Sequence, residues 1–218
     1  MALGMTAPGM LVSDMTAPEK KIAGVLLAAG TASRLGRTKQ LLPFRGSTLL
    51  GRAMENAAAS DLDELIVVLG HEADRILQSL DFSRVKTVIN PDYSKGQGTS
   101  LAKGLEAVSP SCAGALFLLA DQPLVTPDMI NRLIRAFQAS GAPLVIPFYR
   151  GSRGNPVLVA RSLFPRLLSL SADTGARVLF DEYQASILKV EFDTDAVLVD
   201  VDTAQDYEAL LSRPFPEP

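Results

Sequence analysis

Short apolar runs alternate with amphipathic segments along most of the chain, beginning near Lys21. Each run is nearly uninterrupted, as expected for a strand that is buried on both faces. The segments between the runs carry apolar residues at helical spacing, for example Leu101, Leu105 and Val108. Alternation of strands and helices at this spacing predicts right-handed crossovers and a mostly parallel sheet between helices, a three-layer α/β/α fold of Rossmann-like type.

The pattern sets approximate bounds for each element. The predicted strands are Ile22–Ala28, Leu65–Leu69, Val85–Ile89, Ala115–Ala120, Ala142–Pro147, Val157–Ala160, Ile187–Val190 and Val197–Val201. The predicted helices are Leu49–Ser60, His71–Leu80, Ser100–Val108, Thr126–Ser140, Leu163–Ser169, Gly175–Glu182 and Thr203–Ser212. Thr126 is expected to cap its helix and Gly141 to end it.

Ligands of parallel sheets bind at the carboxyl ends of the strands, near the place where the strand order reverses. Three loops begin at such ends: Ala29–Lys39, Asp92–Ser100 and Asp121–Val125. We therefore expect the functional site to be built from these loops.

Length and composition bound the possible functions. The 218 residues are 47% hydrophobic and 21% charged, which suits one large globular domain. A net charge of −3 without a basic stripe gives no reason to expect a nucleic-acid partner. No apolar run is long enough to cross a membrane. The N-terminal residues 1–20 read as a flexible extension, and residues 21–218 as a single domain.

Cysteine and histidine are too scarce for several kinds of site. A single cysteine, Cys112, excludes an internal disulfide and a cysteine-cluster metal site, and its apolar neighbours favour a buried thiol. A histidine-dependent nucleophile would need His71, the only histidine, which is expected to be a capping or surface residue. The lone thiol and the lack of a signal peptide favour the cytoplasm.

The loop after the first strand suits a phosphate-bearing ligand. Ala28, Ala29 and Gly30 are small, so a ligand can approach their backbone amides closely. Arg34 and Lys39 supply two cations that can neutralise a triphosphate. A tight strand–helix junction is the structural alternative. The dinucleotide pattern G-x-G-x-x-G and the Walker pattern are both absent.

The other two loops carry oxygen and amide groups. Asp121 ends a buried strand, and Mg²⁺ prefers such oxygen ligands and needs only one or two carboxylates. An aspartate that caps the turn before Pro123 is the alternative. The loop Gly96–Ser100 suits the edges of a base or ribose, or else simply leads into the next helix.

The segment Leu27–Pro43 is similar to the nucleotidyltransferase signature L-A-A-G-x-[ST]-x-R-x-G-x-x-K-x-L-L-P, with minor departures at Ala32 and Leu35. Further stretches match in family order, and the chain resembles the molybdenum cofactor cytidylyltransferase branch of the MobA-like nucleotidyltransferases. These stretches are Asn90–Tyr93, Gly96–Leu101, Leu119–Val125, Arg153–Leu158, Asp173–Arg177 and Asp200–Thr203.

The resemblance implies a sheet of the nucleotide-diphospho-sugar transferase type and a Mg²⁺-dependent transfer of CMP from CTP to molybdopterin, with release of pyrophosphate. Ala-Ala-Gly at Ala28–Gly30 favours CTP over GTP in that family. The implied catalytic residues are Arg34, Lys39 and Asp121. The implied nucleotide-binding residues are Leu27, Ala28, Ala29, Gly30, Lys39, Gly96, Gln97, Gly98, Thr99, Ser100 and Asp121. The implied acceptor-binding residues are Gln122, Arg153, Gly154, Asn155 and Pro156.

The second metal ligand is open. Asp200 and Asp202 flank Val201 at a predicted strand end, and one of the two is expected to be the ligand. Asp200 is preferred, because Asp202 with Thr203 can instead begin the last helix.

Other functions stay open as well. They are a GTP-using guanylyltransferase, another small-molecule nucleotidyltransferase, a non-catalytic cofactor chaperone for a molybdenum hydroxylase, and an oxidoreductase. A molybdenum hydroxylase apoenzyme is the partner that the resemblance implies. The missing dinucleotide pattern weighs against the oxidoreductase, and retention of Arg34, Lys39 and Asp121 weighs against the chaperone.

Overall fold

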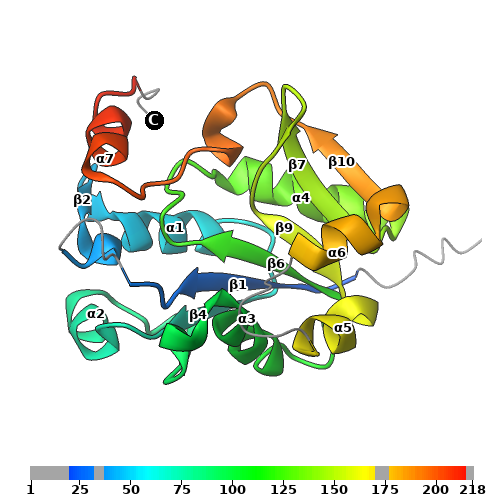
Figure 1. The fold of residues 1–218 in the computed structure, drawn as a ribbon, viewed down its shortest axis with the longest axis horizontal. Helices are drawn as coiled ribbons and strands as arrows, with labels where there is room; N and C mark the ends of the chain where they lie inside the picture. The colour runs from blue at the N-terminus through cyan, green and yellow to red at the C-terminus, as the bar shows by residue number, and fades with distance from the viewer. Residues whose placement is uncertain (1–19, 32–36, 170–176, 215–218) are drawn as a thin grey trace, which may run out of the picture.

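The computed structural model describes residues 20–31, 37–169 and 177–214. Figure 1 shows a central sheet with helices on both faces. The strands are β1 Ile22–Ala28, β2 Pro43–Phe44, β3 Ser47–Thr48, β4 Glu64–Leu69, β5 Lys86–Ile89, β6 Gly114–Leu119, β7 Leu144–Tyr149, β8 Ser152–Arg153, β9 Val157–Ala160 and β10 Ile187–Glu191. The helices are α1 Leu49–Ala58, α2 Ala73–Ser79, α3 Gln97–Glu106, α4 Pro127–Ser140, α5 Phe164–Leu168, α6 Arg177–Glu182 and α7 Ala204–Leu211. Short 3₁₀ helices are η1 Lys39–Leu41, η2 Tyr93–Lys95, η3 Arg161–Leu163, η4 Gln184–Ser186 and η5 Asp195–Val197.

The main sheet has the strand order β10-β7-β9-β6-β1-β4-β5, with β8 paired to β7. β1 lies between β4 and β6 and is parallel to both, which confirms the mostly parallel sheet. β9 is antiparallel to β6 and to β7, and the short β8 is antiparallel to β7. The strand order reverses beside β1. The chain adds β4 and β5 on one side of β1 and then crosses to β6 on the other side.

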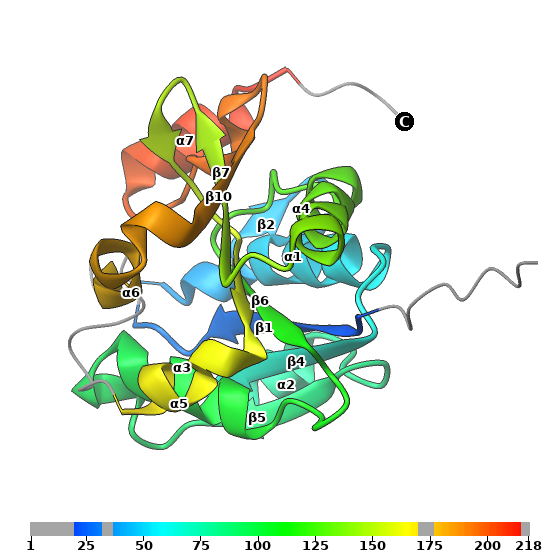
Figure 2. The ribbon, with the colours of Figure 1, turned by 90° about the vertical axis from the view of Figure 1, so that its right-hand side faces the viewer.

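Two apolar clusters hold the helices against the sheet. There is one on each face, because successive side chains of a strand point to opposite faces. One cluster joins the sheet to α1, α2, α4 and α7. The other joins it to α3, α5 and α6. Figures 1 and 2 show α1 and α4 on one side of the sheet and α3 and α5 on the other. The three-layer fold is thus confirmed. Among the described helices, none combines the length and the apolar character needed to cross a membrane.

Helix caps follow the expected chemistry. Thr126 begins α4, and its side chain accepts a hydrogen bond from the Met129 amide. Gly141 ends the same helix with a φ of +65°. Thr203 and Asp206 form a reciprocal capping box at the start of α7. These caps fix where the flanking loops leave the sheet.

The predicted strand Val197–Val201 is wrong. The structure has the 3₁₀ helix Asp195–Val197 there, followed by irregular backbone up to Thr203. The Thr194 side chain caps this turn by accepting from the Ala196 amide, and the Val197 carbonyl accepts from the Asn155 amide. Val197 and Val201 are fully buried, so their apolar character reflects packing without a strand.

Smaller differences concern element bounds. α3 begins at Gln97, earlier than the predicted Ser100. The expected loop Tyr149–Pro156 contains the short strand β8. Gly175, the predicted start of α6, and the extension at residues 1–19 lie outside the described residues.

Helix α3 packs unusually close to the sheet at Gly104. A Cβ atom on Gly104 would lie 2.4 Å from Val25 Cγ1 and 3.2 Å from Val68 Cγ2. We predict that Gly104→Ala lowers the free energy of unfolding by about 1–3 kcal/mol through overpacking. Helix propensity alone predicts the opposite, a gain of about 1 kcal/mol. Urea unfolding measures the difference. Unchanged or increased stability would contradict the close packing.

Candidate active site

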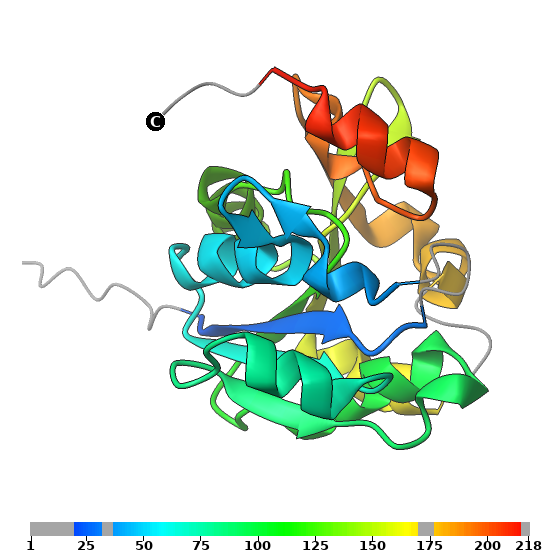
Figure 3. The ribbon, with the colours of Figure 1, turned by 90° about the vertical axis from the view of Figure 1, so that its left-hand side faces the viewer.

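Three loops meet beside the carboxyl end of β1 and enclose a cavity of about 200 Å³. They are the loops after β1, β5 and β6, and the segment before α7 joins them (Figure 3). The cavity is lined by Leu27, Ala28, Ala29, Gly30, Thr31, Lys39, Gln40, Tyr93, Gln97, Ser100, Leu119, Ala120, Asp121 and Asp202. It is smaller than typical pockets of roughly 300–1,000 Å³, so it can enclose only part of a nucleotide.

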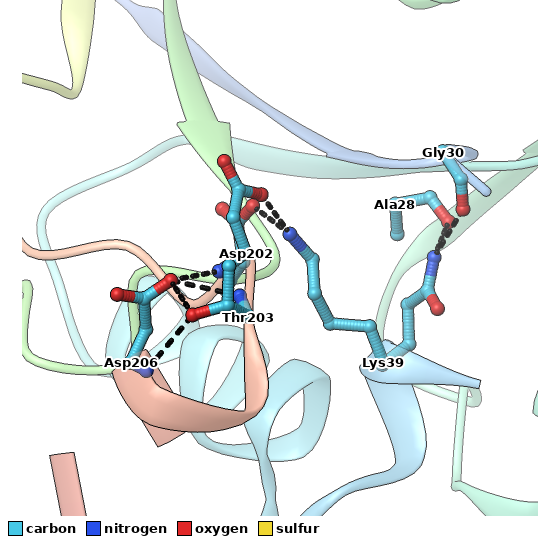
Figure 4. A network of polar contacts seen from close by, with 8 residues as sticks. Ala28, Gly30, Lys39, Asp202, Thr203 and Asp206 are labelled. Carbon is cyan, nitrogen blue, oxygen red and sulfur yellow. Dashed lines mark hydrogen bonds and ion pairs between the residues drawn. The ribbon is translucent and has the colours of Figure 1, made fainter. Parts of the chain in front are cut away.

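Lys39 lies between two carboxylates at this cavity. Its Nζ is 2.6 Å from Asp121 Oδ2 and 2.8 Å from Asp202 Oδ1. Figure 4 shows the Lys39 side chain extending toward Asp202. Three distant segments of the chain are therefore joined by one ammonium group: η1, the end of β6, and the residues before α7.

The same geometry sets the charge state of the site. Burial disfavours the charge of Lys39, but Asp121 and Asp202 outweigh it and raise its pKa. Lys39 is therefore a permanent cation at neutral pH. Burial, followed by the charges of Asp121 and Asp202, raises the pKa of Asp200. Asp200 thus lies in the field of both carboxylates.

The position of Asp202 is fixed by the capping box of α7. Asp206 Oδ2 accepts hydrogen bonds from the amides of Asp202 and Thr203, at 3.1 and 2.7 Å. The Thr203 hydroxyl also donates to Asp206, and Figure 4 shows this network. Thr203 begins the helix, so the Asp202 side chain is left to bind Lys39.

Asp202 lines the cavity, whereas Asp200 is absent from the described lining. The prediction of Asp200 as the second metal ligand assumed a strand at Val197–Val201 and gave Asp202 with Thr203 to the start of the last helix. Irregular backbone takes the place of the strand, and Thr203 caps the helix together with Asp206. The structure therefore brings Asp202 to the Lys39–Asp121 pair, and the metal role of Asp200 stays a prediction.

The residues present suit a divalent cation. One oxygen of Asp121 and one of Asp202 both accept from Lys39 Nζ, so the two carboxylates lie close enough to share one positive charge. The other oxygen of Asp121, Oδ1, is buried and has no hydrogen-bond partner among the described residues. No described cluster of three or more acidic, histidine or cysteine side chains can hold a metal. Mg²⁺ is compatible with this, because it keeps several waters and needs only one or two carboxylates.

The loop after β1 turns its carbonyl groups toward the protein. Gln40 Nε2 donates to the carbonyls of Ala28 and Gly30, at 2.9 and 3.0 Å, and the His71 amide donates to Ala29. The amides of Gly30 and Thr31 have no acceptor in the described part of the chain. Free amides at the carboxyl end of a strand are suited to an anion such as a phosphate.

The loop Gly96–Ser100 divides into cavity residues and supporting residues. Gln97 and Ser100 line the cavity, whereas Gly96, Gly98 and Thr99 are not among its described lining. Thr99 Oγ1 donates to the Gly96 carbonyl at 2.8 Å, as a helix-entry residue does. Of this loop, Gln97 and Ser100 reach the cavity, and the nucleotide-binding role of the loop stays a prediction.

The proposed acceptor residues lie apart from the described cavity lining. Arg153 packs its guanidinium over the Phe180 ring, 4.7 Å from the ring centroid. The amide of Gly154 donates to the Pro147 carbonyl, and Pro156 is buried. Gln122 is also buried, and its Oε1 has no hydrogen-bond partner among the described residues. Acceptor contacts by these residues and by Asn155 stay predictions.

Some predicted site residues fall outside the described part. Arg34 belongs to the undescribed residues 32–36, and the stretch Asp173–Ala176 to residues 170–176. Cys112 is buried as expected, and burial followed by its contact with Glu64 raises its pKa to about 11. A thiol with this pKa is no nucleophile at neutral pH.

Sequence reasoning missed three residues that shape the cavity. Gln40 belongs to the signature but had no assigned role, and Tyr93 belongs to a matching stretch. Asn90 is fully buried and donates to Thr99 and Ser100, which fixes the entry to α3. A polar side chain within an apolar surrounding was the available signal, but hydrogen-bond partners distant in sequence cannot be read from a pattern.

Comparison with known proteins places this site in a family. Residues 24–187 match the family described as the MobA-like NTP transferase domain. The match covers most of the chain, so the protein belongs to this nucleotidyltransferase family.

Curated relatives of the chain carry different names. Nicotine blue oxidoreductase of Paenarthrobacter nicotinovorans is 31% identical over 202 residues, covering 87% of this chain and 96% of the relative. Purine catabolism protein PucB of Bacillus subtilis is 30% identical over 86% of this chain and 94% of the relative. Molybdenum cofactor cytidylyltransferase of Escherichia coli is 27% identical over 84% of this chain and 92% of the relative.

Solved structures of similar proteins share the fold, and one of these proteins was solved with manganese. Rv0371c of Mycobacterium tuberculosis has a TM-score of 0.83 and 32% identity, covering 89% of this chain and 98% of that one. Its complex with manganese has a TM-score of 0.78 and 31% identity, covering 89% and 99%. CMP:2-keto-3-deoxy-manno-octonic acid synthetase, solved with CTP, has a TM-score of 0.73 and 15% identity, covering 88% of this chain and 98% of that one. At this identity the similarity shows the shared fold alone.

Gly30 offers a test of where the ligand lies. A Cβ atom there would meet nothing within 4 Å, and its φ is not positive, so neither packing nor backbone conformation requires glycine. We predict that Gly30→Ala changes the free energy of unfolding by less than about 0.5 kcal/mol. Binding of a nucleoside triphosphate with Mn²⁺, measured by calorimetry, should weaken by about tenfold through steric overlap. Unchanged binding would place the ligand elsewhere.

Proposed function

We propose that this protein is a Mg²⁺-dependent cytidylyltransferase that transfers CMP from CTP to the terminal phosphate of molybdopterin. The acceptor oxygen would bond to the α-phosphorus of CTP, and the bond from that phosphorus to the bridging oxygen would break, releasing pyrophosphate. The observation that carries the proposal is the Lys39 ammonium held between Asp121 and Asp202, beside the amides of Gly30 and Thr31, for which the described residues offer no acceptor.

Positive groups on the protein oppose the charge of the triphosphate. Lys39 is protonated at neutral pH and lines the cavity. The amides of Gly30 and Thr31 would donate to phosphate oxygens, and Arg34 would add a second cation from the signature. Transfer of this kind depends mainly on positioning and charge stabilisation. These groups supply both.

Carboxylates on the protein would hold the metal ion. Asp121 is the principal ligand, because its Oδ1 is buried without a partner. Asp202 shares the Lys39 contact, and Asp200 is the ligand preferred from sequence. Mg²⁺, when bound, supplies charge stabilisation on the phosphates. The manganese complex of the similar mycobacterial protein supports the use of a divalent ion.

No strong general base is needed, because the acceptor phosphate is already ionised near neutral pH. This agrees with a cavity whose described lining contains no histidine. Gln122, Arg153, Gly154, Asn155 and Pro156 would contact the pterin acceptor. The Escherichia coli cytidylyltransferase, a relative over most of the chain, and the Ala-Ala-Gly sequence support CTP as donor. We expect the protein to act in the cytoplasm and to pass its product to a molybdenum hydroxylase apoenzyme.

An oxidoreductase is the second candidate, because a 31% identical relative is named nicotine blue oxidoreductase. The described site favours transfer: it has a cation between carboxylates, and the dinucleotide pattern is missing from the sequence. Oxidation of a reduced nicotinamide cofactor without pyrophosphate release would favour this second candidate.

A pyrophosphate-release assay tests the proposal. The protein is incubated with Mg²⁺, molybdopterin and each of the four nucleoside triphosphates in turn. We predict release with CTP that requires both the acceptor and the metal, and that stops on chelation with EDTA. Release with GTP alone would correct the base assignment, and no release with any triphosphate would contradict a transferase.

Matched variants control this assay. Asp121→Asn should lower turnover about 10²- to 10³-fold, because it removes a carboxylate proposed to hold the metal ion and the charge that pairs with Lys39. Asp128→Asn alters a carboxylate that is 85% exposed and is not among the described lining of the cavity, so it should leave turnover unchanged.

A further inference from the structure

The turn Gly70–Glu72, between β4 and α2, touches the cavity walls at several points. A Cβ atom on Gly70 would lie 2.7 Å from Tyr93 Cβ and 2.8 Å from Ala29 Cβ. The His71 amide donates to the Ala29 carbonyl at 3.2 Å, and its ring packs edge-on to Tyr93 with centroids 5.8 Å apart. Ala29 and Tyr93 both line the cavity. The turn thus supports two walls, although the proposed reaction gives it no role.

Glu72 has a backbone conformation that ordinarily suits glycine. Its φ is +52°, in the left-handed region, which a residue with a Cβ rarely adopts. Strain of this kind persists where surrounding interactions hold it, and it gathers at functional sites. The Glu72 carboxylate accepts from the Thr38 hydroxyl and from Arg75 Nη1, the latter at 3.1 Å. These two bonds also lower the pKa of Glu72.

Thr38 directs its hydroxyl away from its own helix. It occupies the N-cap position of η1, where a threonine hydroxyl commonly accepts from a nearby helix amide. No such bond forms here, and the hydroxyl instead donates to Glu72 and accepts from Arg75 Nη1 at 2.9 Å. Thr38 is only 5% exposed. The start of η1 is therefore tied to α2.

Lys39 lies between two anchored side chains. Thr38 precedes it and is bound to the Glu72–Arg75 pair, and Gln40 follows it and is bound to the loop after β1. The rotamers of a long, flexible side chain do not fix the position of its end group. The position of the ammonium group therefore depends on the backbone that carries the side chain. Fixing both neighbours fixes that backbone.

We propose that Glu72 and Thr38 are positioning residues, which lock the η1 turn so that Lys39 is aimed at Asp121 and Asp202. The role in catalysis rests on the proposed function, whereas the effect on Lys39 itself does not. Glu72 and Thr38 act through Lys39 and contact no substrate.

The variants separate the side-chain bonds from folding. Thr38→Val keeps the shape and removes the hydroxyl, whereas Thr38→Ser keeps the hydroxyl. Glu72→Gly removes the carboxylate while suiting the left-handed backbone. Glu55→Gly is the matched control, because Glu55 also accepts from a hydroxyl, Ser47 Oγ at 2.9 Å, and pairs with an arginine, Arg52 at 3.0 Å. Thermal unfolding confirms that each variant is folded.

Acetylation of Lys39 by an N-hydroxysuccinimide ester, followed by peptide mass spectrometry, gives a readout that needs no enzyme activity. The ester must reach the amine, and the Lys39 side chain is only 17% exposed, with its Nζ held by ion pairs to Asp121 and Asp202. We expect Lys39 to react several-fold faster in Thr38→Val and Glu72→Gly, and at the wild-type rate in Thr38→Ser and Glu55→Gly. An unchanged rate in the first two folded variants would overturn the proposal.

A double-mutant cycle on pyrophosphate release gives the second readout. Thr38→Val and Glu72→Gly should each lower kcat on the order of 10- to 100-fold, as a misplaced catalytic group does. The loss should disappear in a Lys39→Ala background, because the residues act through Lys39. Losses that persist there would contradict the positioning role. A wild type without pyrophosphate release, but with the expected acetylation rates, would refute the proposed function and leave the positioning of Lys39 standing.

Discussion

The ion pairs of Lys39 with Asp121 and Asp202 connect segments that are far apart in the sequence. They form because β1 and β6 are neighbours in the sheet, so the loops that follow these strands meet at one edge. The capping box of α7 then presents Asp202 to the same ammonium group. The sheet order, the cap of the last helix and the 3₁₀ turn that carries Lys39 are all needed for this one contact.

Much of the fold is readable from the sequence because it depends on local patterns. Apolar runs locate β1, β4 and β6, and the Thr126 and Gly141 signals locate the ends of α4. The predicted strand Val197–Val201 was wrong because these apolar residues are buried without belonging to a strand. The Thr194 cap and the Asn155 amide hold the backbone in a turn there.

Only part of the candidate site could be predicted, because local motifs can be read from the sequence whereas contacts between distant segments cannot. Lys39 and Asp121 belong to short motifs, so their residue types could be recognised before their contact was known. Asp202 was set aside for Asp200, since Asp202 with Thr203 could equally begin the last helix; the fold shows that Thr203 caps the helix and that Asp202 binds Lys39. Gln40, Asn90 and Glu72 act through partners elsewhere in the chain, which only the fold reveals. Membership of the MobA-like family indicates nucleotidyl transfer, and the substrates follow from the proposal.

The most direct measurement is a crystal structure of the protein with Mn²⁺ and a CTP analogue whose α,β-bridging oxygen is replaced by methylene. Anomalous scattering then locates the manganese ion. We predict an ion bound to Asp121, with Asp202 or Asp200 as its second carboxylate. We also predict triphosphate oxygens on the amides of Gly30 and Thr31. A manganese ion away from Asp121, or a triphosphate outside this cavity, would contradict the account.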